Sequence, residues 1–243
     1  MDQFLREAWV DEGAPEKGYP YDLPVVRALR EKAVEFHPKV TYLVGENGTG
    51  KSTLMEAMAV VLGFNAEGGT RHLRFSTQDT HSDLDQYLHV ARSKKPRRWF
   101  FFRAESFYNL ASAIDNMDDP EATSPYGGRS LHAVSHGESF LALAQNQFAN
   151  DGLFLLDEPE AALSPGRQLS VLSLIHDSVQ AGSQYVIATH APILMAYPDA
   201  WIYGLSESGL SRISYDDTEH VSITRNFLAN PRRMMRHLFE DQS

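Results

Sequence analysis

The chain has 243 residues, of which 42% are hydrophobic, so it can bury the core of one globular domain. Its 22 basic and 32 acidic side chains leave a formal net charge of −10, which excludes a wholly basic nucleic-acid coat or a polybasic membrane anchor but not a local basic patch. It contains no cysteine, which excludes a disulfide framework, a thiol nucleophile and cysteine-bound zinc.

The first 39 residues are predicted to flank the core. They contain four prolines and indicate only a short strand near 4–10 and a short helix near 25–36. The chain begins without the apolar segment of a signal peptide, and no apolar run approaches the roughly 20 residues of a membrane-spanning helix. We therefore expect a cytoplasmic protein that does not cross a membrane by itself.

A glycine-rich segment follows the first strong strand pattern. Residues 40–44 are β-branched and aromatic, and residues 52–62 are helix formers, so the segment joins a strand to a helix. In that context G-x-x-x-x-G-K-S predicts a phosphate-binding loop whose backbone N–H groups face the phosphates. Lys51 is expected to reach the β- and γ-phosphate oxygens, and Ser52 to ligate Mg²⁺. The predicted nucleotide-binding residues are Gly45, Glu46, Asn47, Gly48, Thr49, Gly50, Lys51, Ser52 and Thr53.

The next hundred residues alternate between polar and apolar segments. Residues 65–98 are interpreted as a surface excursion that ends in basic residues, and 99–102 as a buried strand. Residues 115–129 are acidic and then rich in proline, glycine and serine, which predicts an exposed loop. Residues 139–148 are apolar at helical spacing.

The segment from Ser135 to Glu138 precedes that helix. Its S-x-x-E spacing is typical of a capping box, which satisfies exposed amides at a helix start. In a second interpretation, Ser135, Gly137 and those amides form another anion site. Because the chain already has a phosphate loop, such a site would serve a nucleotide held by another copy.

Two later strands end in side chains suited to ATP chemistry. Residues 153–156 are apolar and lead into Asp157, the predicted second Mg²⁺ anchor, and Glu158, the predicted base that orients or deprotonates the attacking water. After a predicted helix at 168–179, the strand at 185–188 leads to His190, which we expect near the γ-phosphate. The other nine histidines show no metal-ligand spacing and are interpreted as surface or core residues. Strands that alternate with helices predict an α/β fold with a largely parallel sheet.

The order of these motifs resembles that of the ATP-binding-cassette (ABC) ATPase superfamily. They are the phosphate loop, a signature motif at 134–138, a Walker B strand at 153–158, a D-loop at 161–164 and a switch histidine, His190. In detail they are similar to the AAA_21-type predicted ATPases, which are related to RecF-type repair proteins and to chromosome-maintenance ATPase heads, and most of all to a compact stand-alone bacterial group. The resemblance implies a P-loop NTPase fold with an ABC-type core, a small N-terminal β part and a short helical lid.

The resemblance also implies a head-to-tail homodimer that sandwiches two MgATP and reopens on hydrolysis. Each nucleotide would lie between two copies, one contributing Lys51, Ser52, Asp157 and Glu158 and the other contributing Ser135 and Gly137. Glu105 replaces the glutamine of the family's Q-loop, so we do not assign it as an ordinary Mg²⁺ or water ligand. His136 replaces the usual signature glycine, and Ser164 the aspartate that usually ends the D-loop.

We expect a single ABC-type ATPase domain over residues 1–243. Its flank is 1–39, its nucleotide-binding core 40–104 and 150–215, its helical signature sub-domain 105–149, and its tail 216–243. Adenine stacking on Tyr19 or Tyr21 is one interpretation, and an ordinary packed or exposed tyrosine is the other.

Three functions remain open. The first is a soluble ATPase that acts on DNA or a protein partner, with Arg92–Arg98 and the arginines at 232, 233 and 236 either contacting phosphates or forming ordinary solvated charge. The second is the ATP-binding subunit of a membrane transporter, and the third is a nucleotide-gated scaffold in a toxin or phage-defence assembly. Only 29 residues separate Glu105 from Ser135, which is too few for coiled-coil arms or a transporter-type helical sub-domain, and the 53 residues after His190 are too few for a Toprim nuclease domain.

Overall fold

A six-stranded sheet forms the centre of the molecule. The structure is a computed structural model that describes residues 3–69, 82–115 and 136–240. The sheet order is β5-β6-β7-β3-β8-β9, in which five neighbouring strands run parallel and β9 is antiparallel to β8. This confirms the predicted α/β fold with a mainly parallel sheet. The strands are β3 (Val40–Gly45), β5 (Arg98–Arg103), β6 (Gly152–Asp157), β7 (Gln184–Ala188), β8 (Trp201–Ser206) and β9 (Gly209–Ile213).

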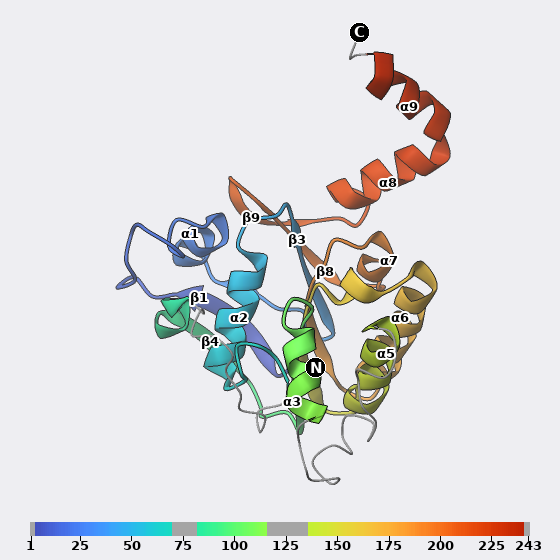
Figure 1. Ribbon diagram of the computed structural model, residues 1–243. Coiled ribbons are helices and arrows are strands. Elements are labelled where there is room, and N and C mark those ends of the chain that lie inside the picture. Colours follow the sequence, from blue (N-terminus) through green and yellow to red (C-terminus); the bar gives the residue numbers. More distant parts are fainter. Residues whose placement is uncertain (1–2, 70–81, 116–135, 241–243) are drawn as a thin grey trace.

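Helices cover both faces of this sheet (Figure 1). One face packs against α1 (Pro24–Glu31) and α2 (Lys51–Leu62). The other packs against α3 (Phe107–Asp115), α5 (His136–Gln147), α6 (Pro165–Gln180) and α7 (Pro192–Met195). Successive side chains of a strand point to opposite faces, so Tyr42 and Leu43 enter different cores. Because both faces are covered, the central strands are continuous apolar runs.

A three-stranded antiparallel sheet forms the predicted small N-terminal β part. Its order is β2-β1-β4, with β1 at Leu5–Val10, β2 at Val34–Glu35 and β4 at Leu88–Arg92. The buried side chain of Gln184, on β7, joins it to the main sheet. This amide accepts the backbone N–H groups of Phe4 and Leu5 at 2.9 and 2.8 Å, and donates to the carbonyls of Leu5 and His37 at 2.8 and 2.9 Å. One side chain therefore satisfies four backbone groups.

Three segments differ from the sequence expectation. The helix predicted over 25–36 ends at Glu31, because residues 34 and 35 pair with β1 instead. The predicted surface excursion at 65–98 includes β4 and a 3-10 helix at Asp83–Gln86 whose Leu84 is buried. The loop predicted over 115–129 lies outside the described residues, except for Asp115, which ends α3. The division of the chain into flank, core, signature sub-domain and tail stays a prediction.

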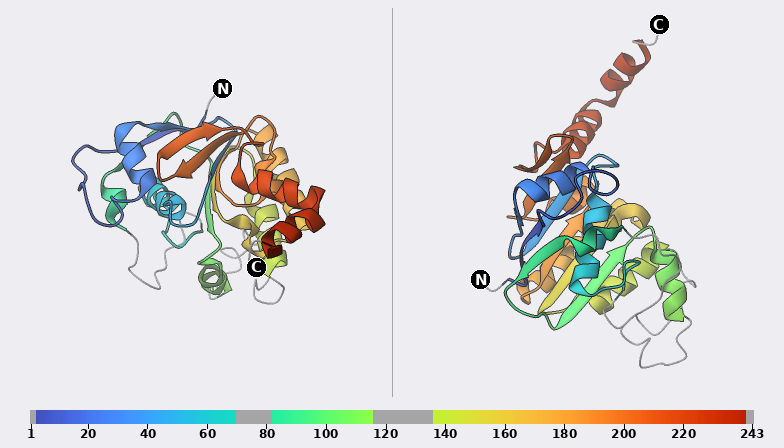
Figure 2. Two further views of the ribbon diagram at one scale, coloured as in Figure 1. Left: turned by 90° about the horizontal axis from the view of Figure 1, so that it is seen from above. Right: turned by 90° about the vertical axis from the view of Figure 1, so that its left-hand side faces the viewer.

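Two helices at the end of the chain leave the body. They are α8 (Glu219–Ala229) and α9 (Pro231–Glu240), and we call residues 219–240 the C-terminal arm. Val221, in the first turn of α8, is buried against the body, whereas the rest of the arm extends away from it (Figure 1 and Figure 2). In the part of the chain that the structure describes, no helix is long and apolar enough to cross a membrane.

Candidate functional site

Three neighbouring strands end at the candidate site. In the sheet order β6, β7 and β3 are adjacent and parallel, so their carboxyl ends meet at one edge. The phosphate loop follows β3, Asp157 ends β6, and His190 comes two residues after β7. The fold therefore brings together side chains that are more than 100 residues apart in the sequence, at the edge where parallel α/β sheets bind their ligands.

The loop between β3 and α2 has the backbone that a phosphate-binding loop needs. Gly48 and Gly50 adopt φ values of +85° and +95°, which residues with a side chain rarely adopt. A Cβ atom at Gly50 would also lie 2.6 Å from Val25 Cγ1. Gly50 is the N-cap of α2 and provides no side-chain cap, so the first amides of this helix remain available to an anion.

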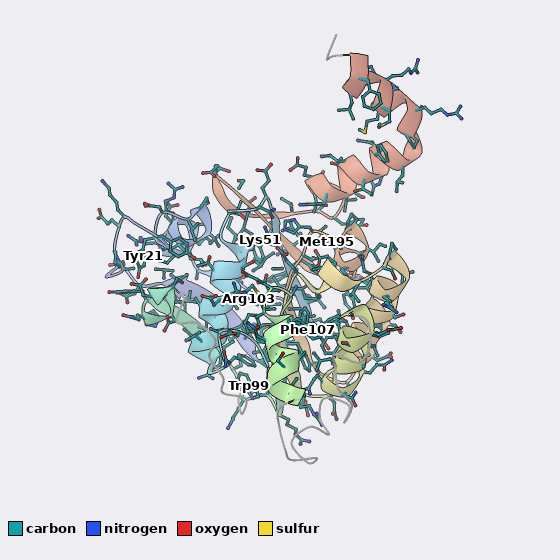
Figure 3. All side chains as sticks on the ribbon, in the orientation of Figure 1. Tyr21, Lys51, Trp99, Arg103, Phe107 and Met195 are labelled. Carbon is teal, nitrogen blue, oxygen red and sulfur yellow. The ribbon has the colours of Figure 1, made fainter. Side chains whose placement is uncertain are left out.

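Lys51 is folded onto its own loop. Its Nζ donates to the carbonyl oxygens of Gly45 and Glu46 at 2.7 and 2.8 Å, and the residue is 4% exposed. Figure 3 labels Lys51 at the start of α2, in the centre of the molecule. Burial lowers the pKa of this ammonium group, although Glu158 and Asp157 favour its charged form. A bound phosphate group would therefore replace the two carbonyl oxygens as the partner of Nζ, and it would carry a full negative charge.

Ser52 and Asp157 form a pair of oxygen ligands. Ser52 Oγ donates to Asp157 Oδ1 at 3.2 Å, and Asp157 is 3% exposed. Burial raises the pKa of Asp157 to about 7, even though Arg103, Ser52 and Lys51 favour the carboxylate. The raised pKa means that the positive charges around Asp157 do not offset the cost of burying its charged form. A hydroxyl and a carboxylate are ligands that Mg²⁺ accepts alongside phosphate oxygens and waters, so the pair fits this ion.

Glu158 and His190 face each other beside this pair. Glu158 adopts a left-handed backbone with φ of +52°, and its side chain is 41% exposed, unlike that of its buried neighbour Asp157. Its Oε1 lies 3.6 Å from His190 Nε2, which is buried and, among the described residues, has no partner within hydrogen-bond distance. The backbone N–H of His190 donates to Glu160 Oε1 at 2.5 Å. Burial lowers the pKa of His190, and the charge of Lys51 lowers it further, so its ring is neutral at physiological pH.

Three residues at the site were not predicted. His220, in α8, was interpreted as a surface or core histidine, yet its Nε2 lies 2.9 Å from His190 Nδ1. Glu160 holds the backbone of His190, and Arg103 contacts Glu56, Glu105 and Asp157 at 2.5, 2.7 and 4.0 Å. Arg103 pairs with Asp157 in the sheet register, so its position at the end of a predicted strand was a usable signal. No local pattern links His220 to His190, because 30 residues separate them.

Other predicted site residues lie apart from this centre or outside the described residues. Tyr21 is 3% exposed in the core, so the suggestion that it stacks on adenine is wrong. Tyr19 is 70% exposed, and its hydroxyl lies 3.4 Å from Thr53 Oγ1 at the end of the phosphate loop. Ser135 lies outside the described residues. Gly137 is buried in the first turn of α5.

A cleft of about 530 Å³ opens between the phosphate loop and the C-terminal arm. Its walls come from the loop, from the strand end after β7 and from the first turns of α8. The lining residues are Glu46, Asn47, His190, Glu219, His220, Ile223 and Thr224. The unpartnered His190 Nε2 and the cleft therefore lie at the same end of the sheet.

Comparison with known proteins agrees with this geometry. A family model described as "AAA domain" matches residues 25–114. The chain is 31% identical over 177 residues to the hemin import ATP-binding protein HmuV of Streptomyces coelicolor, covering 66% of this chain and 63% of that protein. It is also 31% identical over 207 residues to the HmuV of Nocardia farcinica, covering 78% and 70%. The chain thus spans less than two thirds of the length of the first relative and slightly more of the second.

The fold is also found among solved structures. An ATP-binding cassette of an ABC transporter superposes with a TM-score of 0.51 at 14% identity, over 92% of this chain and 99% of that one. This likeness concerns the fold, whereas the sequence relationship to the HmuV proteins concerns the family. With the motifs in their expected order, the chain belongs to the ATP-binding-cassette ATPases.

Proposed function

We propose that the chain hydrolyses MgATP at the interface of an ATP-induced head-to-tail homodimer and couples this cycle to DNA or to a protein partner in the cytoplasm. The observation that carries the proposal is the convergence of Lys51, the Ser52 and Asp157 pair, and the Glu158 and His190 pair at one sheet edge. These are the charge-neutralising, metal-holding and proton-accepting groups that phosphoryl transfer to water requires.

Nucleotide binding is assigned to the phosphate loop and to Lys51. In this proposal the Nζ atom leaves the carbonyls of Gly45 and Glu46 and contacts the β- and γ-phosphates, while the first amides of α2 face the same oxygens. Ser52 and Asp157 would hold Mg²⁺, whose chemical contribution is to neutralise the charge on the phosphates. With a divalent cation beside it, Asp157 remains ionised despite its burial.

Glu158 is assigned as the base, and His190 as a donor to the γ-phosphate. The Glu158 carboxylate is partly exposed, so a water molecule can reach it and be oriented for attack. His190 Nε2 is buried and has no acceptor within hydrogen-bond distance, which suits an N–H group that waits for a phosphate oxygen.

The second copy completes the site. The exposure of Glu158 leaves the reaction centre open to solvent on one side, and closure by another subunit would exclude bulk water. We assign this closure to Ser135 and to the backbone around Gly137. Because glycine has no side chain, the contact with the nucleotide that we propose for Gly137 is made by its backbone.

The first experiment measures the solution mass of Glu158→Gln with and without MgATP, and again with short duplex DNA. The proposal expects a mass that doubles with MgATP, because this variant binds ATP without turning it over. The double variant Lys51→Ala with Glu158→Gln is the matched control and stays monomeric. DNA that comigrates with the dimer supports the DNA partner. A mass that ignores MgATP contradicts the homodimer.

The second candidate function is an ATP-binding subunit of a membrane transporter. The relatives named as hemin import ATP-binding proteins favour it. This function predicts that the tagged chain purifies from its native cells with a detergent-solubilised membrane protein that stimulates its ATP turnover. A chain that copurifies with DNA or a soluble protein, and whose turnover that partner stimulates, contradicts the transporter function.

A further inference from the structure

The C-terminal arm exposes a stripe of large apolar side chains. Ile223, Phe227 and Leu228 on α8, and Leu238 and Phe239 on α9, are between 37% and 69% exposed. Residues four apart lie on the same side of a helix, so Ile223 and Phe227 continue the side on which His220 faces the candidate site. Exposed apolar area of this kind is typical of a surface that another molecule covers.

The stripe begins at the nucleotide site and leads away from the body. Ile223 lines the same cleft as His190 and the phosphate-loop residue Glu46. The arm then extends into solvent (Figure 2). Any molecule that closes the nucleotide site would therefore also meet the first turns of this stripe.

The charges of the arm and the body are complementary. α9 carries three arginines and one acidic residue, Glu240, whereas the whole chain carries −10. Four acidic residues, Glu46, Glu207, Asp217 and Glu219, line a second cleft of about 520 Å³ beside the phosphate loop, and Glu219 is the first residue of the arm. Because the arm extends away from its own body, the opposite charges of α9 and of this acidic surface suit a contact between two copies.

We propose that the C-terminal arm docks on a second copy of this chain, across the nucleotide face, and thereby contributes to the ATP-induced dimer. This inference rests on the proposed homodimer. It adds an interface outside the nucleotide sandwich, in which Phe227 and Leu228 bury apolar area and the arginines of α9 contact acidic side chains of the partner.

The test compares two double variants in the Glu158→Gln background. Phe227→Gln with Leu228→Gln removes the apolar stripe, and Ser222→Gln with Asn226→Gln, on the opposite side of α8, is the matched control. With MgATP, the stripe variant is expected to raise the dimer dissociation constant at least about tenfold, while the control and the affinity for a fluorescent ATP analogue remain unchanged.

The outcomes separate the arm from the homodimer. If the parent Glu158→Gln protein does not dimerise, the proposed homodimer fails and the arm interface with it. If the stripe variant dimerises as tightly as the control, only the arm interface fails. If the stripe variant dimerises like the parent and yet loses the parent's flotation with phosphatidylserine-containing vesicles, that result would assign the surface to a membrane instead.

A separate observation concerns the two paired histidine rings. His190 Nδ1 lies 2.9 Å from His220 Nε2, and His190 Nε2 faces the Glu158 carboxylate. A neutral imidazole carries one N–H group and one acceptor nitrogen. Because a carboxylate and a phosphate only accept, the N–H of His190 belongs on Nε2, which leaves Nδ1 as the acceptor. His220 must then donate from Nε2.

We infer that His220 is a positioning residue, which fixes the tautomer and orientation of His190. The inference rests on the role proposed for His190. Lys51, Glu158 and the backbone contact to Glu160 surround the His190 ring, and His220 is the partner that the described residues offer to its Nδ1. Loss of this donor would allow the ring to turn or to exchange tautomer, which removes the N–H from the γ-phosphate.

Three substitutions test this role. His220→Gln keeps an N–H donor on a side chain of similar reach, His220→Phe keeps the ring without the donor, and His220→Ala removes both. The alanine and phenylalanine variants are expected to lower kcat at least about tenfold with little change in KM, and glutamine to restore most of it. The ¹⁵N shifts of His190 should report the Nε2–H tautomer in the parent and in His220→Gln.

A glutamine variant as slow as alanine, or an alanine variant with parent kcat, overturns the positioning role. His190→Ala distinguishes the two levels of the proposal. If His190→Ala turns over ATP at the parent rate, the role of His190 itself is wrong and the positioning role falls with it. If His190→Ala is slow and His220→Ala is not, only the positioning role is wrong.

Discussion

At the residue scale, the buried carboxyl of Asp157 has a strongly raised pKa at the centre of the candidate site. Burial raises its pKa from 3.8 to about 7, so the folded state binds this proton more tightly than the unfolded state. The corresponding stability is fully present below pH 4 and is lost as the pH rises toward and through 7. One pKa unit corresponds to about 1.4 kcal/mol, so the loss is on the order of 4 kcal/mol.

Asp157→Asn removes this ionisation and keeps the shape of the side chain. Without nucleotide and metal, the free energy of unfolding of the parent should therefore fall more steeply between pH 5 and pH 8 than that of Asp157→Asn, by several kcal/mol. Urea denaturation at both pH values measures the difference. Other titrating groups are common to the two proteins and cancel. Parallel pH profiles would show that the pKa of Asp157 is not raised.

The two catalytic assignments predict different defects. Lys51→Ala removes the ammonium group that neutralises phosphate charge, so we expect the dissociation constant for ATP to rise by about 100-fold or more. Glu158→Gln keeps the size of the side chain but removes the base, so binding remains and kcat falls about 100-fold or more. Fluorescent-nucleotide titration and phosphate release measure the two effects. Glu12→Gln, at an exposed position in the loop after β1, is the control. Undiminished turnover by Glu158→Gln would refute its role.

At the element scale, the sequence predicts the segments in which every side chain has the same buried environment. The strands β3, β5, β6 and β7 are buried on both faces, so their apolar runs were recognisable. β8 and β9 were missed because Gly204 and exposed polar residues interrupt the apolar pattern at the sheet edge. α9 was not predicted, although its apolar side chains recur at helical spacing. The joint between the two sheets depends on Gln184, which no local pattern indicates.

That joint gives a prediction about stability. Gln184→Leu keeps a similar volume but leaves three buried backbone groups of residues 4 and 5, and the partly buried carbonyl of His37, without their partner. Each unsatisfied group costs about 1 to 3 kcal/mol, and relaxation recovers part of this, so we expect a loss of roughly 3 kcal/mol or more. Thermal and urea denaturation measure it. Gln180→Leu, at an exposed position of α6, should change stability by less than about 0.5 kcal/mol. Equal stabilities would mean that the joint carries little energy.

At the scale of the whole molecule, the proposed homodimer makes the candidate site half of a functional unit. The motif order and the strand ends predicted the part of the site that one chain contains. The phosphate loop, Asp157 and His190 come together because they lie at the carboxyl ends of neighbouring parallel strands. In the proposed homodimer, a second copy supplies the other half of each site. No contact within a single subunit can therefore test that half. It can be established by complementation between subunits, because a head-to-tail dimer builds each site from two different copies.

Lys51→Ala disables the phosphate-loop half of a site, and Ser135→Arg disables the half contributed to the other copy. Each variant alone should be inactive, because every site in its homodimer contains the defect. In a hybrid of the two, one site combines the intact loop of the Ser135→Arg copy with the intact Ser135 of the Lys51→Ala copy. Mixing should therefore restore turnover to on the order of a tenth of the parent rate or more.

The matched control mixes Lys51→Ala with Glu158→Gln, which place both defects in the same half. Every site of that hybrid remains defective, so no activity should return, although the subunits can still associate. Phosphate release from both mixtures, at several protein concentrations, distinguishes the arrangements. Recovery in the first mixture alone requires a site shared between copies, whereas silence in both would mean that Ser135 does not act across a dimer. Active Ser135→Arg on its own would remove the signature segment from the site altogether.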